Sequence, residues 1–271
     1  MNKIKVLFVT LFAMAFSVSA LAQPVINKIN NSASIGFNES LLNYQEAVPP
    51  ADGVSDSESG YMPGFDVDLN VMQNLFGVNN VYFHADNRYN SGTVAYKGGV
   101  GFTPYNTTDS ATTETFGFRV GKGFATFNHK LMFTPYVGVG YYAWNRALQG
   151  PYGYTENYSN GYASIGLLTQ YAFTNHLVLS GVTSLGLVYG GSLTAHIHGQ
   201  TLNSSAFKTT GRERITANID YLFTRHLYTY AGVSYTHFNY SGAPIPSVPG
   251  AFEPSSATNR FGIHVGLGFS F

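Results

Sequence analysis

The sequence contains no cysteine, a single tryptophan among 271 residues, and few charged side chains. Without cysteine, neither a disulfide framework nor a cysteine-based metal site can form. Asp, Glu, Lys and Arg make up 10% of the chain, against about 25% in typical soluble proteins. Acidic and basic residues are equal in number, at 14 each. A chain without a strongly basic face is not expected to bind nucleic acid, so that partner is excluded.

Long hydrophobic runs are also missing once the first 22 residues are set aside. Residues 1–22 are predicted to be a signal peptide, because Lys3 and Lys5 precede an apolar stretch and residues 20–22 fit a small-x-small cleavage site. Residues 23–271 hold no run of about 20 apolar residues, which argues against membrane-spanning helices. A membrane β-barrel stays open, since each of its strands needs only about 9–11 alternating residues.

Aromatic residues and glycine are abundant, with 20 Tyr, 21 Phe and 30 Gly. They alternate most clearly in residues 261–271, where six bulky apolar side chains are separated by Gly, His and Ser. A period of two is typical of a strand and cannot form one face of a helix. The positions with bulky apolar side chains are predicted to face lipid, and the alternate positions with small side chains to face a crowded lumen.

The same alternation predicts an all-β fold, a transmembrane antiparallel up-and-down β-barrel that forms one domain over residues 23–271. Ten strands are expected, within a range of eight to twelve. Short connections alternate with long ones, which is typical of periplasmic turns and outer loops. A propeller with a repeat of about 50 residues is disfavoured, because each repeat holds only two long strands. The predicted strands are 33–46, 60–72, 79–90, 113–123, 131–146, 158–173, 177–190, 211–223, 227–240 and 259–271.

Two regions fit this pattern less well. Residues 91–112 are predicted as a long connection, although residues 94–102 could instead extend the third strand or form a small outer hairpin. Glu39 falls on the lipid-facing parity between Phe37 and Leu41, so a bulge is expected near it.

The final strand carries a family resemblance. Its apolar alternation, ending on Phe271, looks like the terminal signal that the outer-membrane barrel assembly machinery reads. Residues 133–141 (FTPYVGVGY) also resemble the strand motif of the small OmpA/OmpX-like and opacity-type surface barrels, whose typical members have eight strands. The resemblance covers residues 23–271. The residues it assigns to the assembly signal are Phe261, Ile263, Val265, Leu267, Phe269 and Phe271.

This resemblance implies a location in the outer membrane of a Gram-negative bacterium. It implies contact with outer-membrane lipid and lipopolysaccharide, and insertion by the barrel assembly machinery. Family members act as adhesins, evasion factors, structural barrels or narrow channels, so a host or cell-surface ligand would bind through the outer loops.

Charged residues on the small parity are predicted to meet in the lumen, where Asp–Arg pairing would compensate their charge. Narrow barrels are filled by their own side chains, and Tyr136, Tyr142, Trp144 and Tyr230 are expected to fill the bore further. A closed lumen is therefore favoured over a small pore. The predicted lumen network consists of Asp66, Asp68, Asp86, Arg88, Arg119, Arg214, Asp220 and His264. Tyrosines expected at the membrane interfaces are Tyr141, Tyr152, Tyr154, Tyr158, Tyr162, Tyr228, Tyr235 and Tyr240.

No pattern predicts a catalytic residue, a metal site or a cofactor. Asp66 and Asp68 share one strand face, as a catalytic carboxylate pair would, and omptin surface proteases also have ten strands. Those enzymes, however, place their acidic pair at the outer rim, whereas this pair falls in the middle of a strand. His196 and His198 supply two ligands, fewer than the three or four that zinc takes. The acidic first loop, with Asp52, Asp56 and Glu58, is interpreted as a solvated loop.

The predicted function is that of a non-enzymatic surface barrel. Its outer loops would contact host, matrix or other cells, or the barrel would stabilise the membrane. A narrow, porin-like passive channel is the alternative, and an omptin-like protease is less favoured.

Overall fold

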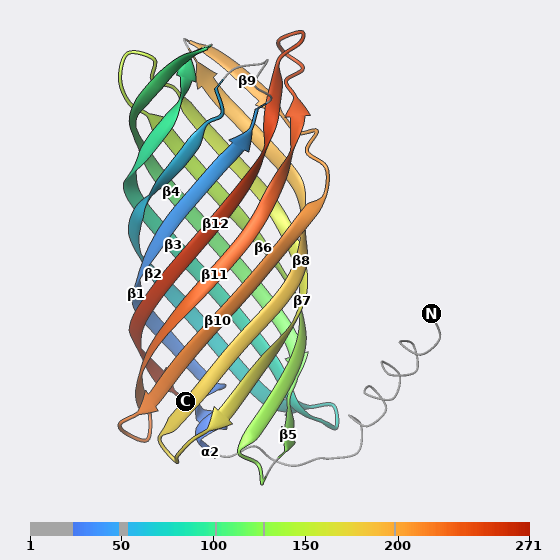
Figure 1. The fold of residues 1–271 in the computed structure, drawn as a ribbon. Coiled ribbons are helices and arrows are strands. Elements are labelled where there is room, and N and C mark those ends of the chain that lie inside the picture. The colour runs from blue at the N-terminus through green and yellow to red at the C-terminus, as the bar shows by residue number, and fades with distance from the viewer. Residues whose placement is uncertain (1–23, 49–53, 101, 127, 198) are drawn as a thin grey trace.

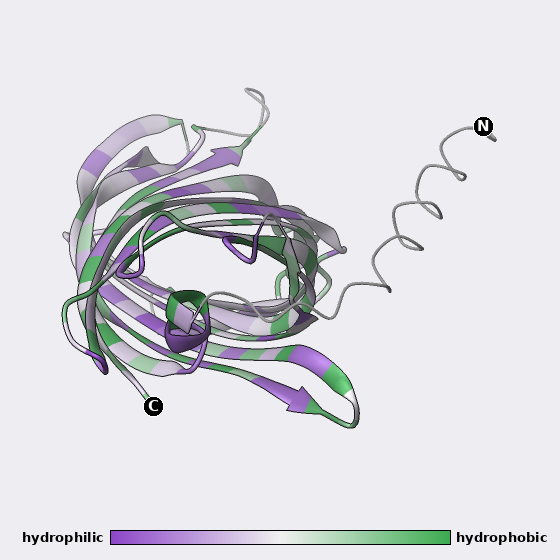
Figure 2. Ribbon diagram, turned by 90° about the horizontal axis from the view of Figure 1, so that it is seen from below, coloured by the Kyte–Doolittle hydropathy of each residue, from purple (hydrophilic) through white to green (hydrophobic). Residues whose placement is uncertain are grey.

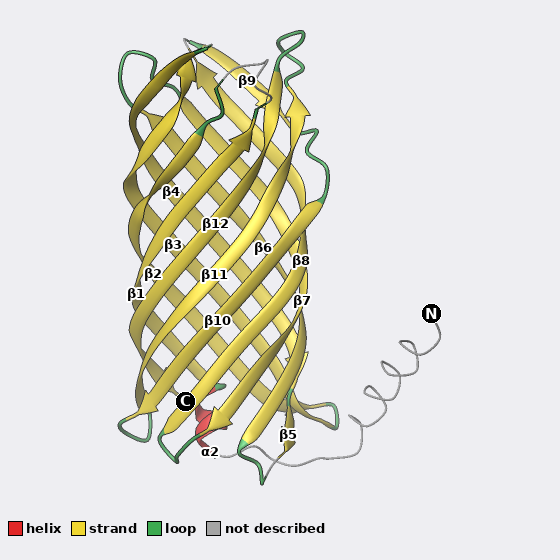
Figure 3. Ribbon diagram, viewed as in Figure 1, coloured by secondary structure: helices red, strands yellow, loops and turns green. Residues whose placement is uncertain are grey.

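A computed structural model describes residues 24–48, 54–100, 102–126, 128–197 and 199–271; the predicted signal peptide lies outside these residues. Ten long antiparallel strands form a closed barrel, which confirms the predicted fold (Figures 1 and 3). Its strands are β1 (Ser32–Ala47), β2 (Ser57–Leu75), β3 (Val78–Val100), β4 (Thr103–Lys122), β6 (Leu131–Leu148), β7 (Thr155–Ala172), β8 (Leu177–Ile197), β10 (Thr210–Leu222), β11 (Leu227–Pro244) and β12 (Phe252–Ser270). Two short strands, β5 (Phe124–Thr126) and β9 (Gln200–Ser204), extend hairpins with β6 and β8.

Each long strand pairs with its neighbours in sequence, and β12 closes the barrel on β1. The closing register runs without a break from Ser32↔Ser270 to Ala47↔Ser255. Pairing of β8 with β10 passes over the short β9. Among the described residues, the ten long strands have no free edge in the membrane-spanning part of the barrel, as strands in lipid require, because hydrocarbon offers the backbone no hydrogen-bonding partner.

The outward side chains form an apolar belt around the middle of the barrel. On β12 and at Phe271, the six residues of the predicted assembly signal all face outward and are 50–61% exposed. Phe37 of β1 and Ile165 of β7 are similarly exposed on their own strands. A soluble protein would not expose so many large apolar side chains together, so this belt is the lipid-facing surface. The role of the last strand in assembly remains a prediction.

Both ends of the described chain lie at one end of the barrel, together with the short turns; this is the periplasmic end in the predicted orientation (Figure 1). Phe76 and Gly77 link β2 to β3 with φ angles of 51° and 78°, the two positive values of a type I′ hairpin. The turns at 173–176 and 223–226 share one design. In each, the side-chain oxygen of a threonine accepts a hydrogen bond from the backbone N–H of the histidine two residues later, with O···N distances of 3.1 and 3.2 Å.

The prediction of a long connection at 91–112 is wrong, and its alternative, an extended third strand, is correct. β3 and β4 pair without interruption from Val81↔Lys122 to Val100↔Thr103. Their outward side chains beyond the belt are small and polar rather than apolar, as at Thr93 and Ser110. The hydrogen-bonded ladder continues above the lipid, where strands no longer need an apolar face.

The expected bulge at Glu39 is also absent from the described β1. Glu39 faces outward opposite Pro63 and Ile263, and both registers pass it unbroken. A shift occurs instead at Gly190, at the end of the strand predicted over 177–190. Gly190 has a φ of 61°, which glycine adopts without steric cost. This bulge moves the inward parity from even to odd residues, so that Leu193 and Ala195 are buried.

A short helix, α2 (Pro24–Ile29), occupies the periplasmic mouth of the barrel (Figures 1 and 2). Val25, Ile26 and Ile29 are buried in one apolar cluster with side chains of several strands, including Met132 and Leu168. Two hydrogen bonds join the amides of Asn30 and Gln170, at 2.7 and 3.0 Å. The segment before β1 therefore closes this end of the lumen. Within the described residues, no helix has the length and apolarity needed to cross a membrane.

Candidate functional site in the barrel lumen

The eight residues of the predicted lumen network all lie on inward-facing positions of five strands. Because side chains two residues apart share a strand face, Asp66 and Asp68 point inward together from β2, and Asp86 and Arg88 from β3. Arg119, Arg214, Asp220 and His264 come from β4, β10, β10 and β12.

Asp86 is the centre of the closest ionic contacts in this network. One carboxylate oxygen accepts a hydrogen bond from Arg119 Nη2 at 3.0 Å and lies 2.9 Å from Nε2 of His84. His84 also lies 3.7 Å from Asp68, and its other ring nitrogen contacts Asn70 at 2.8 Å. The pairing of an aspartate with an arginine across strands is thus present at Asp86 and Arg119.

The other predicted residues have neutral partners. Asp66 accepts a hydrogen bond from the hydroxyl of Tyr230 at 2.6 Å. Asp220 accepts one from Ser180 at 3.2 Å, with no arginine within ion-pair distance in the described chain. His264 contacts the side-chain oxygen of Asn218 at 2.9 Å. Hydroxyl and amide groups of the barrel wall therefore satisfy much of the polar lumen.

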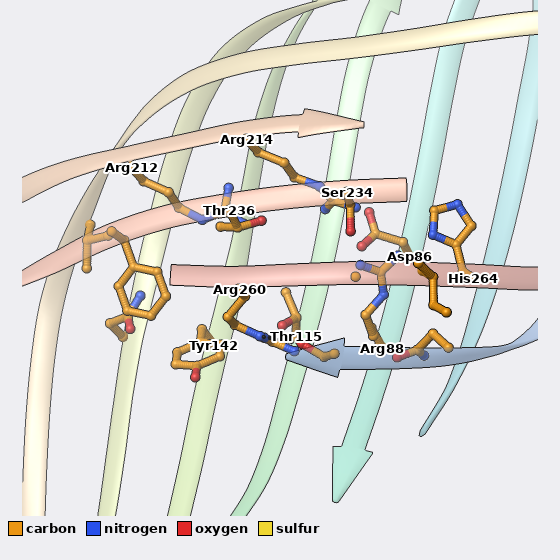
Figure 4. A pocket seen from close by; sticks show the side chains of 17 residues that line it. Asp86, Arg88, Thr115, Tyr142, Arg212, Arg214, Ser234, Thr236, Arg260 and His264 are labelled. Carbon is orange, nitrogen blue, oxygen red and sulfur yellow. Dashed lines mark hydrogen bonds between the residues drawn. The ribbon is translucent and has the colours of Figure 1, made fainter. Parts of the chain in front are cut away.

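Among the cavities of the described lumen, two bear on its chemistry. A lower cavity of about 100 Å³ lies above α2, among Asp68, Asp220 and Tyr228. The second, named here the arginine cavity, has a volume of about 30 Å³ and is shown in Figure 4. Cavities of these sizes hold a few water molecules each.

Above the arginine cavity lies a layer of aromatic rings. Trp144 is fully buried, with Tyr44 edge-on at 4.8 Å and Tyr158 stacked at 5.3 Å between ring centroids. Tyr142 and Phe238 pack edge-to-face at 5.1 Å beside them. These rings belong to a second buried cluster that fills the outer part of the bore. The lumen is thus packed at both ends, by α2 below and by this aromatic layer above.

The prediction of interface positions is wrong for four of the eight tyrosines. Tyr158, Tyr162, Tyr228 and Tyr240 are buried inside the barrel rather than placed at the membrane surface. The prediction used the residue type alone, which favours the lipid headgroup region. Whether a tyrosine faces the lumen or the lipid depends instead on its position in the alternation along the strand. Tyr141 lies on the exposed outer face, as expected.

The feature that sequence reasoning missed is an ionic cluster at the outer end of the lumen, above the apolar belt. Arg146 of β6 is buried there, with four carboxylates within 4.0 Å. Glu58 makes the shortest contact, and Glu156 and Asp109 lie 3.1 and 3.6 Å from guanidinium nitrogens. We name as the upper acidic cluster Arg146 with Glu46, Asp56, Glu58, Asp109, Glu156 and Glu253.

Phenol hydroxyls donate hydrogen bonds to three carboxyl groups of this cluster. Tyr44 donates to Glu46 at 2.9 Å, and Tyr158 donates to Glu253 at 2.6 Å. Tyr96 donates to Asp56, also at 2.6 Å. The interpretation of Asp56 and Glu58 as part of a solvated loop is therefore wrong; Glu58 is 1% exposed within β2. Asp52 lies outside the described residues.

One guanidinium cannot neutralise six carboxylates, and the pKa values reflect this excess. Burial raises the pKa of Glu46 from 4.5 to about 7, with a further rise from Asp56, while Arg146 opposes it. Burial also raises the pKa of Glu58 to about 9, against the attraction of Arg146. The pKa values of Asp109, Glu156 and Glu253 are raised as well, chiefly by burial. Part of the cluster therefore holds protons at neutral pH.

No described histidine lies within 4.0 Å of a carboxylate of this cluster. Among the described histidines, His84 alone pairs with carboxylates, and it lies far below, in the lower lumen. His196 is exposed and contacts Thr201, while His198 lies outside the described residues. Nor does any group of three or more His, Asp or Glu in the described chain have a metal-binding arrangement.

Solved structures resemble the chain in fold, whereas comparisons of its sequence find no match. No family model matches the chain, and no curated protein matches it in sequence. Among solved structures, the outer membrane protease OmpT from Escherichia coli matches with a TM-score of 0.63 and 10% identity, over 93% of this chain and 99% of OmpT. The translocator domain of the autotransporter NalP from Neisseria meningitidis matches with a TM-score of 0.43 and 10% identity, over 99% and 95%. Ail of Yersinia pestis matches with a TM-score of 0.33 and 9% identity, over 89% and 99%. The chain has the fold of the outer-membrane β-barrels, as its sequence predicts.

Proposed function

We propose that this protein is a non-enzymatic surface barrel of the outer membrane, whose outer wall and loops contact other cells, host tissue or matrix. The observation that carries the proposal is the packing of the lumen at both ends. With α2 below and the aromatic layer above, the bore offers no wide path for a solute. Recognition is then left to the outer surface, where loops on a rigid scaffold commonly carry function.

The side chains on the outer wall above the apolar belt are of types that can bind a partner. Its outward side chains are mostly uncharged hydroxyls and amides, joined in cross-strand pairs such as Ser59–Asn43 at 2.6 Å and Ser159–Ser192 at 2.8 Å. At the loops, Phe102, Tyr152 and Phe252 are 48–72% exposed. Neutral hydrogen-bonding groups fit a sugar layer such as that of lipopolysaccharide, and exposed rings fit a protein or glycan partner.

The absence of enzymatic activity is part of the same proposal. The upper carboxylates are buried and bound by Arg146 or by phenols, so none is poised to activate a water molecule beside a histidine. A narrow channel is not favoured, because conduction would require the stacked rings at Trp144 to separate. Insertion through the barrel assembly machinery, with the last strand as signal, remains a further prediction.

Adhesion of bacteria tests the contact function. Cells that express the barrel should bind cultured epithelial monolayers, or surfaces coated with fibronectin, laminin or collagen, more than cells with an empty vector. The triple variant F102S/Y152S/F252S should lose this gain while a heat-dependent gel shift shows a folded barrel. Unchanged adhesion to all these surfaces, with or without the barrel, would contradict the contact function.

Planar bilayers test the closed lumen separately. The refolded protein should leave the bilayer silent. Discrete, reproducible conductance steps would contradict closure and favour the channel instead.

A further inference from the structure

The arginine cavity is lined by four arginines but by a single carboxylate. Figure 4 shows their side chains pointing into the same space. The carboxylate is that of Asp86, which already binds Arg119 and His84. The four arginines are Arg88 of β3, Arg212 and Arg214 of β10, and Arg260 of β12.

None of these four guanidinium groups has a carboxylate oxygen within 4.0 Å in the described chain, where the arginine ion pairs involve Arg119 and Arg146. Buried charges without a partner are costly. A lysine or histidine would escape that cost by losing its proton, but arginine keeps its charge in proteins. Asp68 and Asp86 act on Arg88 and Arg214 only from beyond ion-pair distance, so an anion from outside the chain would supply the direct contact that these arginines lack.

Neutral groups hold the guanidinium groups in place without cancelling their charge. Arg260 donates to Asn90 at 3.0 Å and to Ser40 at 3.3 Å. Arg212 lies over the ring of Tyr162, with its central carbon 4.1 Å from the ring centroid. The Nε group of Arg88 is buried without a hydrogen-bond partner in the described chain. The donors are thus positioned by the barrel wall and directed into a shared space.

The size of the cavity limits the ligand. A volume of about 30 Å³ fits about two molecules of the size of water. Tyr142 and Phe238 of the aromatic layer line its outer side. A nucleotide, a sugar phosphate or a lipid headgroup would not fit this space, whereas a halide ion would.

We propose that the arginine cavity binds a chloride ion, held by guanidinium N–H groups and enclosed as the barrel closes around it. The ion supplies the negative charge that the wall does not, and it stabilises the closed lumen. Because packed side chains cover the cavity above and α2 lies below, a bound ion exchanges slowly with solvent.

Slow exchange makes the ion measurable. The barrel is refolded in sodium chloride, passed by gel filtration into sodium gluconate, and denatured, and the released chloride is measured by ion chromatography. The wild type should release stoichiometric chloride, and the R214Q/R260Q variant several-fold less. R225Q is the matched control, because Arg225 lies in an exposed periplasmic turn, and it should release as much as the wild type. Chloride at background level from the folded wild type would overturn the proposal.

Two further measurements keep the test decisive if the double variant does not fold. The single variant R260K keeps the positive charge and should retain the ion. Crystals of wild-type barrel refolded in sodium bromide should show an anomalous peak within hydrogen-bonding distance of Arg214 and Arg260. Bromide at surface positions only, an adventitious ion only, or water alone in the cavity would each overturn the assignment.

Discussion

The carboxyl group of Glu46 gives the barrel a stability that depends on pH. Its pKa is raised from 4.5 to about 7, mainly by burial, so the folded barrel holds a proton that the unfolded chain has already released. Such a group contributes its full stabilisation below the unfolded pKa, and loses it as the pH rises through the folded pKa. The difference between the two pKa values corresponds to roughly 3 kcal/mol in the free energy of unfolding. The barrel should lose about this amount from Glu46 between about pH 4.5 and pH 7.

Substitution E46Q removes the titrating group and keeps most of its shape. Between about pH 4.5 and pH 7, the free energy of unfolding of this variant should fall by roughly 3 kcal/mol less than that of the wild type. Some pH dependence should remain, because Asp56 and Glu156, which face Glu46 together with Arg146, also have raised pKa values. Urea unfolding in lipid vesicles measures this, with the fluorescence of Trp144 as the signal. Trp144 is the only tryptophan, and it stacks within the same outer layer.

The control is E114Q, which makes the same chemical change on the outer face of β4. Glu114 is exposed and accepts a hydrogen bond from Asn87 at 3.1 Å. Its variant should follow the wild-type dependence on pH. Equal pH dependence in E46Q and the wild type would refute the view that buried, protonated carboxylates fill the outer lumen.

Three other changes test the packing of the lumen and wall. R146M leaves Glu58 and Asp109 without their cation, and should cost about 3–5 kcal/mol at neutral pH; urea titration measures the loss, and unchanged stability would contradict the ion-pair assignment. W144A removes the ring between Tyr44 and Tyr158 and should cost about 3–5 kcal/mol; urea titration followed by circular dichroism measures the loss, and unchanged stability would contradict tight packing of the aromatic layer. G36V places a side chain against Tyr230 and within 2.7 Å of the carbonyl oxygen of Val265, so folding yield on gels should drop, whereas G211V has open space and should fold normally.

The barrel could be predicted from sequence because lipid and lumen impose opposite demands on alternate residues. In residues 261–271 every second side chain is bulky and apolar, and the structure turns all of these outward. Where lipid no longer covers the strands, that pattern ends although the strands continue. Residues 91–112 therefore resembled a loop, while the ladder from Ser91↔Thr112 to Val100↔Thr103 shows unbroken strands.

The outer ionic cluster was missed for the same reason. Glu46, Glu58 and Glu156 fall at or beyond the ends of the predicted strands, where charge suggested solvent. Their neighbours two residues away carry the usable signal: Tyr44 and Tyr158 share their inward parity and are fully buried. A charged residue that alternates with small polar residues, next to an aromatic residue of the same parity, indicates a lumen position above the membrane.

The distribution of charge also explains why the proposed partner surface lies outside the bore. A conducting lumen keeps its charges hydrated, whereas here Asp66 is bound by Tyr230, and Arg146 is bound by carboxylates and surrounded by rings. Moving a solute through would break these contacts in a medium where unpaired charges cost several kcal/mol each. The outer wall, by contrast, presents hydroxyls and amides that water already solvates, as at Ser59 and Asn43. Binding there exchanges hydrogen bonds with water and leaves the packed lumen intact, which supports the proposed contact at the outer wall over transport through the bore.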